Sequence, residues 1–150
     1  MKKIHLLVVI LFISCSVYAQ KKDVQESAVP KLIKDNFSTK YPDAKNRSWK
    51  TKNGDYEVDF NFESKKLEAK YTTDGTWKKT SMNINKKELP STILESHNKS
   101  EFRSWMIDDI KQIETPDYKI LYFIRVVKAR NITELLYNPL GELMKVTDKN

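Results

Sequence analysis

The sequence predicts an α+β fold made of two tandem units, each a helix packed on an antiparallel sheet of about four strands. Three patterns predict it: the chain repeats internally, each repeat opens with apolar residues at helical spacing, and alternating apolar and polar residues follow. The recurring segments are Val29-Pro30 as Leu89-Pro90, Asp55-Tyr56 as Asp117-Tyr118, and Glu68–Lys79 as Glu134–Lys145. They lie 60, 62 and 66 residues apart (89 − 29, 117 − 55, 134 − 68), which indicates a duplicated supersecondary unit with small insertions.

The N-terminus has the layout of a secretory signal peptide over residues 1–19. Lys2 and Lys3 precede an apolar stretch over residues 4–13, and Ala19 offers a small residue for cleavage. The apolar stretch is too short for a membrane span. Cleavage after Ala19 removes Cys15, the only cysteine of the chain, so the sequence predicts an exported, periplasmic or secreted protein without disulfides.

A second interpretation of this segment is a lipoprotein. Residues 12–15 loosely resemble a bacterial lipobox, in which Cys15 would carry a lipid and anchor the chain, although Phe12 is a poor match to the usual Leu. Membrane association is expected only in that case. The formal net charge of +7 becomes 7 − 2 = +5 without Lys2 and Lys3. No continuous Lys/Arg track accompanies it, so nucleic-acid binding is not expected.

The first unit is predicted over residues 27–84. Its helix is indicated by apolar residues at intervals of four, which share one helical face: Val29, Ile33, Phe37 and Tyr41. Pro30 suits the first turn and Pro42 ends the helix. A strand follows with one apolar face, made of Tyr56, Val58, Phe60 and Phe62. Its other face is predicted to be in water and carries Glu57, Asp59, Asn61 and Glu63. Asn53-Gly54 and Asp74-Gly75 predict hairpin turns.

The second unit is predicted over residues 85–147. Leu89, Ile93 and Leu94 open its helix. The apolar face of its sheet is expected to contain Tyr118, Ile120, Tyr122 and Ile124, followed by Leu135, Tyr137 and Leu143. A unit of about 60 residues is marginal by itself, so the two units are expected to share a core or one continuous curved sheet. Residues 20–26 are predicted to be a flexible lead-in and residues 148–150 a frayed tail.

The sequence offers little chemistry for catalysis. His97 is the only histidine left after cleavage, and it falls where the first repeat has Phe37, so it is expected to be a buried helix residue. No common catalytic, metal or nucleotide motif is present, which predicts a protein that is not an enzyme and needs no cofactor. The acidic strand face could hold calcium through Asp55, Glu57, Asp59 and Glu63, but pairing with Lys66 and Lys70 on the next strand is favoured.

Four segments carry a resemblance to a known family: Val29-Pro30, residues 40–44, residues 56–58 and residues 73–77. In these segments the chain resembles the PepSY-like, beta-lactamase-inhibitor-like family of exported bacterial proteins. The resemblance implies tandem helix-on-sheet units with an open, concave sheet face, which in the inhibitors grips a partner enzyme. The resemblance does not imply that this chain binds the same target, because those inhibitors contain disulfides that this chain lacks after cleavage. Inhibition of a beta-lactamase is therefore only an analogy at the level of the fold.

A candidate binding surface emerges when the polar faces of the two repeats are compared at the offsets above. Asp59, Asn61 and Lys70 then correspond to Leu121, Phe123 and Leu136. Apolar residues in place of charges indicate a contact surface, rimmed by Arg125 and Glu134. The alternative is that the junction between the repeats, a loop or a second helix covers this face within the monomer.

These patterns favour a non-catalytic envelope protein that binds another protein through its open sheet face, with an inhibitor-like architecture. Two alternatives remain open at this point. One is a carrier or sensor of a small ligand or peptide, which needs a deep concave pocket. The other is a structural factor of the envelope anchored by a lipid on Cys15.

Overall fold

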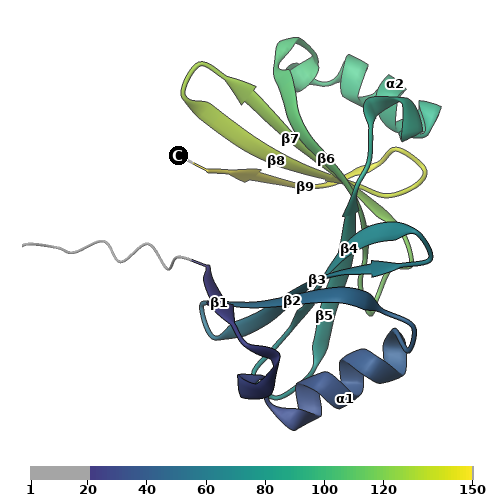
Figure 1. Cartoon of the computed structure of the whole chain (residues 1–150). Helices are drawn as coiled ribbons and strands as arrows, with labels where there is room; N and C mark the ends of the chain where they lie inside the picture. The colour runs from purple at the N-terminus through teal and green to yellow at the C-terminus, as the bar shows by residue number, and fades with distance from the viewer. Residues whose placement is uncertain (1–20, 150) are drawn as a thin grey trace, which may run out of the picture.

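A computed structural model describes residues 21–149, which form one nine-stranded antiparallel sheet with two α-helices (Figure 1). Every strand pairs with the next one along the chain. The elements are β1 (Lys22–Val24), η1 (Glu26–Ala28), α1 (Lys31–Lys40), β2 (Lys45–Lys52), β3 (Asp55–Phe62), β4 (Lys65–Tyr71), β5 (Trp77–Asn83), η2 (Lys86–Glu88), α2 (Ser91–Lys99), η3 (Glu101–Ser104), β6 (Met106–Glu114), β7 (Leu121–Lys128), β8 (Asn131–Tyr137) and β9 (Leu143–Asp148). The continuous sheet predicted from the sequence is confirmed, and it joins the repeats through β5 and β6.

Both helices lie on the same face of the sheet. The hydroxyls of Tyr41, at the end of α1, and Thr80 in β5 are hydrogen-bonded, which places Thr80 on the α1 side. Thr80 lies opposite Glu114 of β6, and Ile110, four residues earlier on the same strand, belongs to the core beneath α2. Because side chains alternate along a strand, Glu114 and Ile110 point to one face. The opposite side of the sheet, the open face, carries neither α-helix.

The first core forms where the apolar face of α1 meets β2, β3 and β4. Phe37 has no solvent exposure, and its ring lies 4.9 Å from that of Phe60, edge to face. The buried members of this cluster are Val29, Ile33, Phe37, Tyr41, Trp49, Val58, Phe60, Ala69 and Tyr71. The predicted helical face and the predicted apolar face of β3 therefore meet each other.

The second core lies beneath α2 and has fewer aromatic residues. Ile93 and His97 are the buried residues of this helix, at the places of Ile33 and Phe37. The helix is followed by η3, whose Phe102 packs edge to face on Trp105 with ring centroids 5.3 Å apart. The buried members of the cluster are Leu89, Ile93, Phe102, Ile110, Tyr122, Ile124, Val126, Leu135 and Tyr137.

Both repeats use the same glycine turn between their last two strands. The N–H of Gly75 donates to the carbonyl of Thr72, and the N–H of Gly141 donates to that of Asn138, each at 3.0 Å. Both glycines have a positive φ near +86° (85° and 87°), in the left-handed region that favours glycine. The predicted turn at Asp74-Gly75 is confirmed, and so is the turn at Asn53-Gly54 between β2 and β3.

The predicted lead-in and tail are more ordered than expected. Residues 22–24, predicted to be flexible, form β1, in which Val24 lies opposite Trp49 of β2. At the other end Asp148 belongs to β9 and accepts a hydrogen bond from the hydroxyl of Thr133 at 2.7 Å. Backbone pairing accounts for both differences, because a polar segment gains hydrogen bonds at a sheet edge without burying apolar side chains. The predicted signal peptide and Cys15 lie outside the described residues.

The alignment of Asp55-Tyr56 with Asp117-Tyr118 is wrong. Tyr56 faces Tyr71 in the first repeat and Tyr122 faces Tyr137 in the second, so the matching residues are 66 apart (122 − 56). Tyr118 precedes β7, where its N–H and carbonyl bond to Thr115, and it is exposed. The reason is the loop before β7, which spans residues 115–120, whereas residues 53–54 suffice before β3.

The predicted position of Ile120, in the same loop, is also wrong. Ile120, predicted to line the apolar face of the second sheet, also precedes β7 and is exposed. Tyr122 and Ile124 do lie on that face, and Val126 continues it. Within residues 21–149, no helix has the length and apolar character needed to cross a membrane.

Candidate functional site: the open face of the sheet

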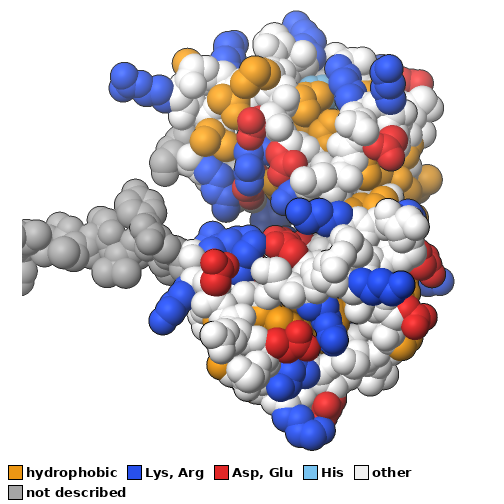
Figure 2. All heavy atoms as spheres, in the orientation of Figure 1, with side chains coloured by type: hydrophobic (Ala, Val, Ile, Leu, Met, Phe, Trp, Pro, Cys, Tyr) orange, Lys and Arg blue, Asp and Glu red, His pale blue; other side chains and the backbone are white. Residues whose placement is uncertain are grey.

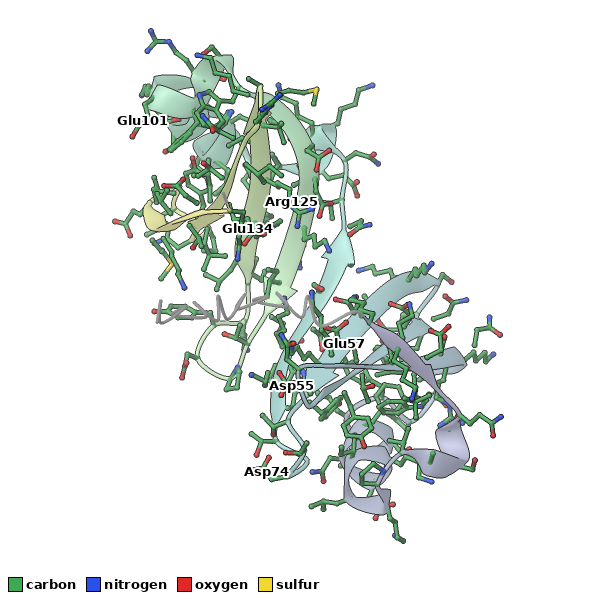
Figure 3. All side chains as sticks on the ribbon, turned by 90° about the vertical axis from the view of Figure 1, so that its left-hand side faces the viewer. Asp55, Glu57, Asp74, Glu101, Arg125 and Glu134 are labelled. Atoms are coloured by element: carbon green, nitrogen blue, oxygen red, sulfur yellow. The ribbon has the colours of Figure 1, made fainter. Side chains whose placement is uncertain are left out.

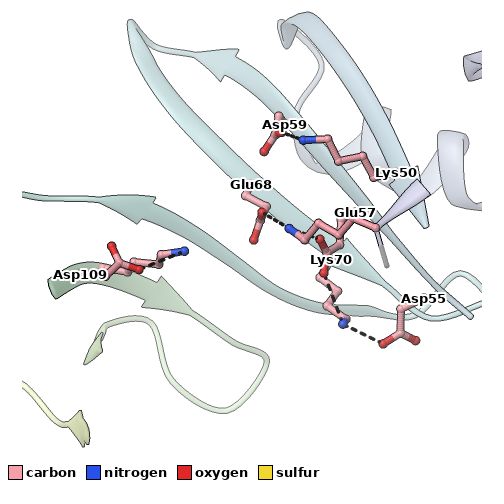
Figure 4. Close-up of polar contacts among 9 residues, drawn as sticks. Lys50, Asp55, Glu57, Asp59, Glu68, Lys70 and Asp109 are labelled. Carbon is pink, nitrogen blue, oxygen red and sulfur yellow. Dashed lines mark hydrogen bonds and ion pairs between the residues drawn. The ribbon is translucent and has the colours of Figure 1, made fainter. Parts of the chain in front are cut away.

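The half of the open face that belongs to the first repeat is a network of ion pairs. The Lys50 ammonium lies 2.6 Å from the Asp59 carboxylate, and Lys70 lies 3.1 Å from Asp55 (Figure 4). These are cross-strand contacts, so the predicted pairing of the acidic strand is confirmed for Lys70. No group of three or more metal-ligating side chains occurs among the residues that the structure describes.

Glu57 lies at the centre of this network and is 6% exposed. The prediction that it faces water is therefore wrong. Lys21, which precedes β1, reaches over the sheet and places its ammonium 2.6 Å from the Glu57 carboxylate, while Lys70 approaches to 3.5 Å. Burial by itself would raise the pKa of Glu57, but Lys21 and Lys70 outweigh it and hold the pKa below its usual value. Sequence reasoning missed Lys21, because its role depends on β1 pairing with β2.

Lys79 of β5 lies beside the network without joining it. It faces Lys70 across the strands, and within residues 21–149 it makes no ion pair at 4.0 Å or less. Burial lowers the pKa of Lys79, and the neighbouring charges of Lys111 and Lys70 lower it further, despite the acidic residues nearby. The first repeat thus presents a buried carboxylate, that of Glu57, and a half-buried ammonium, that of Lys79, to the open face.

The half of the open face that belongs to the second repeat contains an apolar patch made of Leu121, Phe123 and Leu136. Phe123 and Leu136 lie directly opposite each other on β7 and β8, and both are half-buried. Leu121 is 3% exposed. The structure therefore brings together the three apolar residues that the sequence singled out.

The register changes which first-repeat residues this patch replaces. Leu121 and Phe123 take the places of Asp55 and Glu57, not those of Asp59 and Asn61, since the offset is 66 rather than 62. Leu136 does take the place of Lys70. The cross-strand pair of Glu57 with Lys70 in the first repeat thus corresponds to the pair of Phe123 with Leu136 in the second. An ion pair at one position of the repeat has become an apolar pair at the other.

Arg125 and Glu134 form the rim of the patch (Figure 3). The Arg125 guanidinium lies 3.3 Å from the Glu134 carboxylate, its neighbour across the strands, and 5.7 Å from the centre of the Phe123 ring. A second carboxylate, that of Asp108, lies 3.8 Å from Arg125, and Lys149 lies 3.4 Å from Glu134. These contacts hold the planar guanidinium beside the aromatic ring.

The junction between the repeats covers part of the patch. Ser81, Ile113 and Leu121 form a row across β5, β6 and β7, and all three are buried. Leu121 therefore packs within the monomer, as the alternative interpretation expects. Phe123 and Leu136 remain partly accessible, because α2 lies on the opposite face. In Figure 2 charged side chains of both signs are spread over the visible face, including the region where the two halves meet.

A groove of about 390 Å³ runs along the open face where β4, β5 and β6 adjoin. Eight of its eleven lining residues are polar or charged, among them Asp59, Lys66, Glu68, Asn83 and Lys111. Pockets that hold small ligands are usually lined by apolar and aromatic residues. The groove therefore offers more to a charged group on a protein surface than to an apolar small molecule.

His97 is buried at the end of α2, as predicted. Burial lowers its pKa from 6.5, and the positive charge of Lys86 adds to the effect. With a lowered pKa the folded state takes up the proton at lower pH than the unfolded state, so stability is lost as pH falls below 6.5.

We expect His97→Phe to weaken this pH dependence, because phenylalanine cannot titrate and Phe37 fills the equivalent position. Urea unfolding of both proteins at pH 7.5 and pH 5.0 measures it. The drop in unfolding free energy between the two pH values should be smaller for the variant, and an equal drop would contradict a titrating His97.

Comparison with known proteins agrees with this architecture. The family model that matches the chain is described as "Putative beta-lactamase-inhibitor-like, PepSY-like", and it matches residues 15–66 and 54–145. The two segments overlap at residues 54–66 and together span both repeats. No curated protein sequence matches the chain at a significant level.

Several solved structures share the fold. A BLIP-like protein from Bacteroides fragilis has a TM-score of 0.69 and 22% identity, over 79% of this chain and 85% of that one. A structure of "putative periplasmic proteins" from Bacteroides eggerthii has a TM-score of 0.68 and 20% identity, over 80% and 88%. A DUF2874 family protein from Bacteroides ovatus has a TM-score of 0.70 and 21% identity, over 79% and 86%. The matched segments span both repeats, and the chain therefore belongs to the PepSY-like, beta-lactamase-inhibitor-like family.

Proposed function

We propose that the protein is a non-catalytic, exported protein that binds another protein of the cell envelope through the open face of its sheet. The observation that carries this proposal is the replacement of the Glu57 and Lys70 pair by Phe123 and Leu136 at the same place in the repeat. Membership of a beta-lactamase-inhibitor-like family supports a non-catalytic role, and a structural neighbour called periplasmic supports export.

The chemistry of the surface fits a protein partner. Phe123 offers a partly accessible aromatic ring, and Arg125 lies beside it with its charge held by Glu134. Aromatic residues and arginine are enriched where protein interfaces are strongest, and a polar rim around an apolar centre is the usual arrangement. The charged half of the same face, with Lys79 unpaired among the described residues, adds sites for complementary charge.

The test is a double variant, Phe123→Glu with Leu136→Lys, which copies the cross-strand ion pair of the first repeat into the second. It removes the apolar patch while keeping a favourable pair on the same strands. The full-length gene is expressed with its own leader, and the purified wild type and variant serve as baits in a native envelope extract. We expect a partner on the wild type to be lost or bound at least about 30-fold more weakly by the variant, as for a hot-spot loss of about 2 kcal/mol.

The matched control is Leu32→Glu, which places a charge at an exposed apolar position of α1, on the opposite side of the sheet. It should retain the partner. Equal capture by the wild type and the double variant would contradict the proposal, provided that circular dichroism shows both to be folded. The intact mass of the purified wild type reports whether the chain starts at Gln20 or carries a lipid on Cys15.

A further inference from the structure

The two edges of the nine-stranded sheet differ in how they end. At one edge lies β1, a short strand whose residues are Lys22, Asp23 and Val24. At the other edge lies β9, which is twice as long and runs from Leu143 to Asp148. Proteins usually protect sheet edges with short strands, charges or proline, because unpaired backbone groups invite another strand. The β1 edge is protected in this way, because the strand is short and two of its three residues are charged. Strand β9 is less protected, because it is longer and contains Leu143, Met144 and Val146.

Strand β9 is the repeat equivalent of β5. Leu143 lies opposite Tyr137 as Trp77 lies opposite Tyr71, and in both strands the register shifts at the same place. Beyond this bulge, Val146 lies opposite Leu135 at the place where Thr80 lies opposite Ala69. The outer edges of β5 and β9 are therefore equivalent positions of the repeat.

The far edge of β5 is paired and that of β9 is not, within residues 21–149. Residues 80–83 of β5 pair with β6, and residues 146–149 are their counterparts. Thr80 is 6% exposed, whereas Val146 is 45% exposed. In the first repeat this edge is therefore covered by an antiparallel strand, β6.

The side chains of β9 suit a covered position. Leu143, Met144 and Val146 are all exposed large apolar residues. A hollow of about 320 Å³ beside Val146, lined also by Phe102 and Trp105, lies on the side of α2. Exposed apolar side chains on an unpaired strand mark a docking surface.

We propose that β9 pairs with β9 of a second copy of this chain, in antiparallel orientation, so that two sheets join into one. A second copy is the occupant that the edges themselves favour. Pairing of β9 with the β1 edge of another copy would use a short strand with two charged residues and would grow into an open chain. Pairing of like edges around a two-fold axis closes after two copies.

The charges of β9 select one register. Residues directly opposite in an antiparallel pair point to the same face, so a two-fold axis perpendicular to the sheet places one residue opposite its own copy. With Lys145 at the centre, two lysines oppose each other; with Thr147 at the centre, Lys145 opposes Lys149. With Val146 at the centre, the valines meet and Lys145 opposes Thr147. This register alone among the three avoids lysine against lysine.

The first test is sedimentation equilibrium of the protein purified from its full-length gene, over about 1 to 300 µM, a range that covers weak interfaces. We expect a reversible monomer–dimer equilibrium for the wild type. Val146→Glu places two carboxylates against each other and should weaken the dimer at least tenfold, whereas Met106→Glu, an exposed apolar site on β6, should not. The open-face double variant should also dimerise like the wild type, which separates this proposal from the binding function.

The second test reads the register directly and does not depend on a destabilising change. In a Cys15→Ser background, Val146→Cys should form a disulfide-linked dimer on mild oxidation, because opposed strand residues lie within disulfide reach. Met106→Cys is the control for random collisions. A wild type that stays monomeric at the highest concentration, assemblies larger than a dimer, or cross-linking no faster than the control would each overturn the proposal.

Discussion

Replacement of Phe37 by alanine is expected to lower the free energy of unfolding by about 3–5 kcal/mol, the usual cost of removing a buried phenyl ring. Phe37 has no solvent exposure, and its ring contacts four other aromatic rings, those of Tyr41, Trp49, Phe60 and Tyr71. These side chains come from α1 and three strands, so the cavity cannot close by a small local shift. Urea unfolding followed by tryptophan fluorescence measures the loss.

The matched control is Leu32→Ala, in the same helix and 55% exposed. This change should lower the free energy of unfolding by well under half as much as Phe37→Ala, because about half of the Leu32 side chain is already in water. If Phe37→Ala lowers the free energy of unfolding by less than about 1 kcal/mol, the ring of Phe37 is not tightly packed in the first core.

Replacement of Gly141 by alanine is expected to cost more than the same change at Gly54. Both glycines have left-handed backbones, with φ of 87° and 83°, where a side chain costs about 1–2 kcal/mol. At Gly141 a Cβ would also lie 2.6 Å from the carbonyl oxygen of Thr92 in α2, whereas at Gly54 nothing lies within 4 Å. The crowding against backbone adds about 1–3 kcal/mol.

The comparison of the two alanine variants tests how the turn before β9 packs on α2. The hydroxyl of Thr92 donates to the carbonyl of Pro139 at 3.0 Å, so a displaced turn also breaks this bond. In the first repeat the Asn36 side chain donates to the carbonyl of Gly75 at 2.9 Å and ties the equivalent turn to α1. Thermal and urea unfolding of both variants measure the difference, and equal losses would show that the turn moves freely away from the helix.

Local patterns in the sequence predicted much of this fold correctly. The four-residue spacing from Val29 to Tyr41 identified the buried face of α1, and the alternation around Val58 identified the buried face of β3. Both patterns work because helices and strands repeat their side-chain directions at fixed periods. The turn glycines were also predictable, since a left-handed backbone restricts the choice of residue.

Long-range pairing was harder to predict. The sequence matched Phe123 to Asn61, but the register matches it to Glu57, because the loop over residues 115–120 lengthens the second repeat before β7. The role of Lys21 also escaped prediction, because its approach to Glu57 depends on the pairing of β1 with β2. Neither loop length nor edge pairing leaves a periodic signal in the chain.

The repeats, their helices, their alternating strands and their turns could all be predicted from the amino-acid sequence, because each follows from local periodicity and backbone preference. Three features became visible only in the folded protein: β5 and β6 join the repeats into one sheet, Phe123 and Leu136 replace an ion pair, and β9 is an unpaired edge within residues 21–149. These features depend on which strands meet and in what register, and that is settled by contacts between residues far apart in the chain.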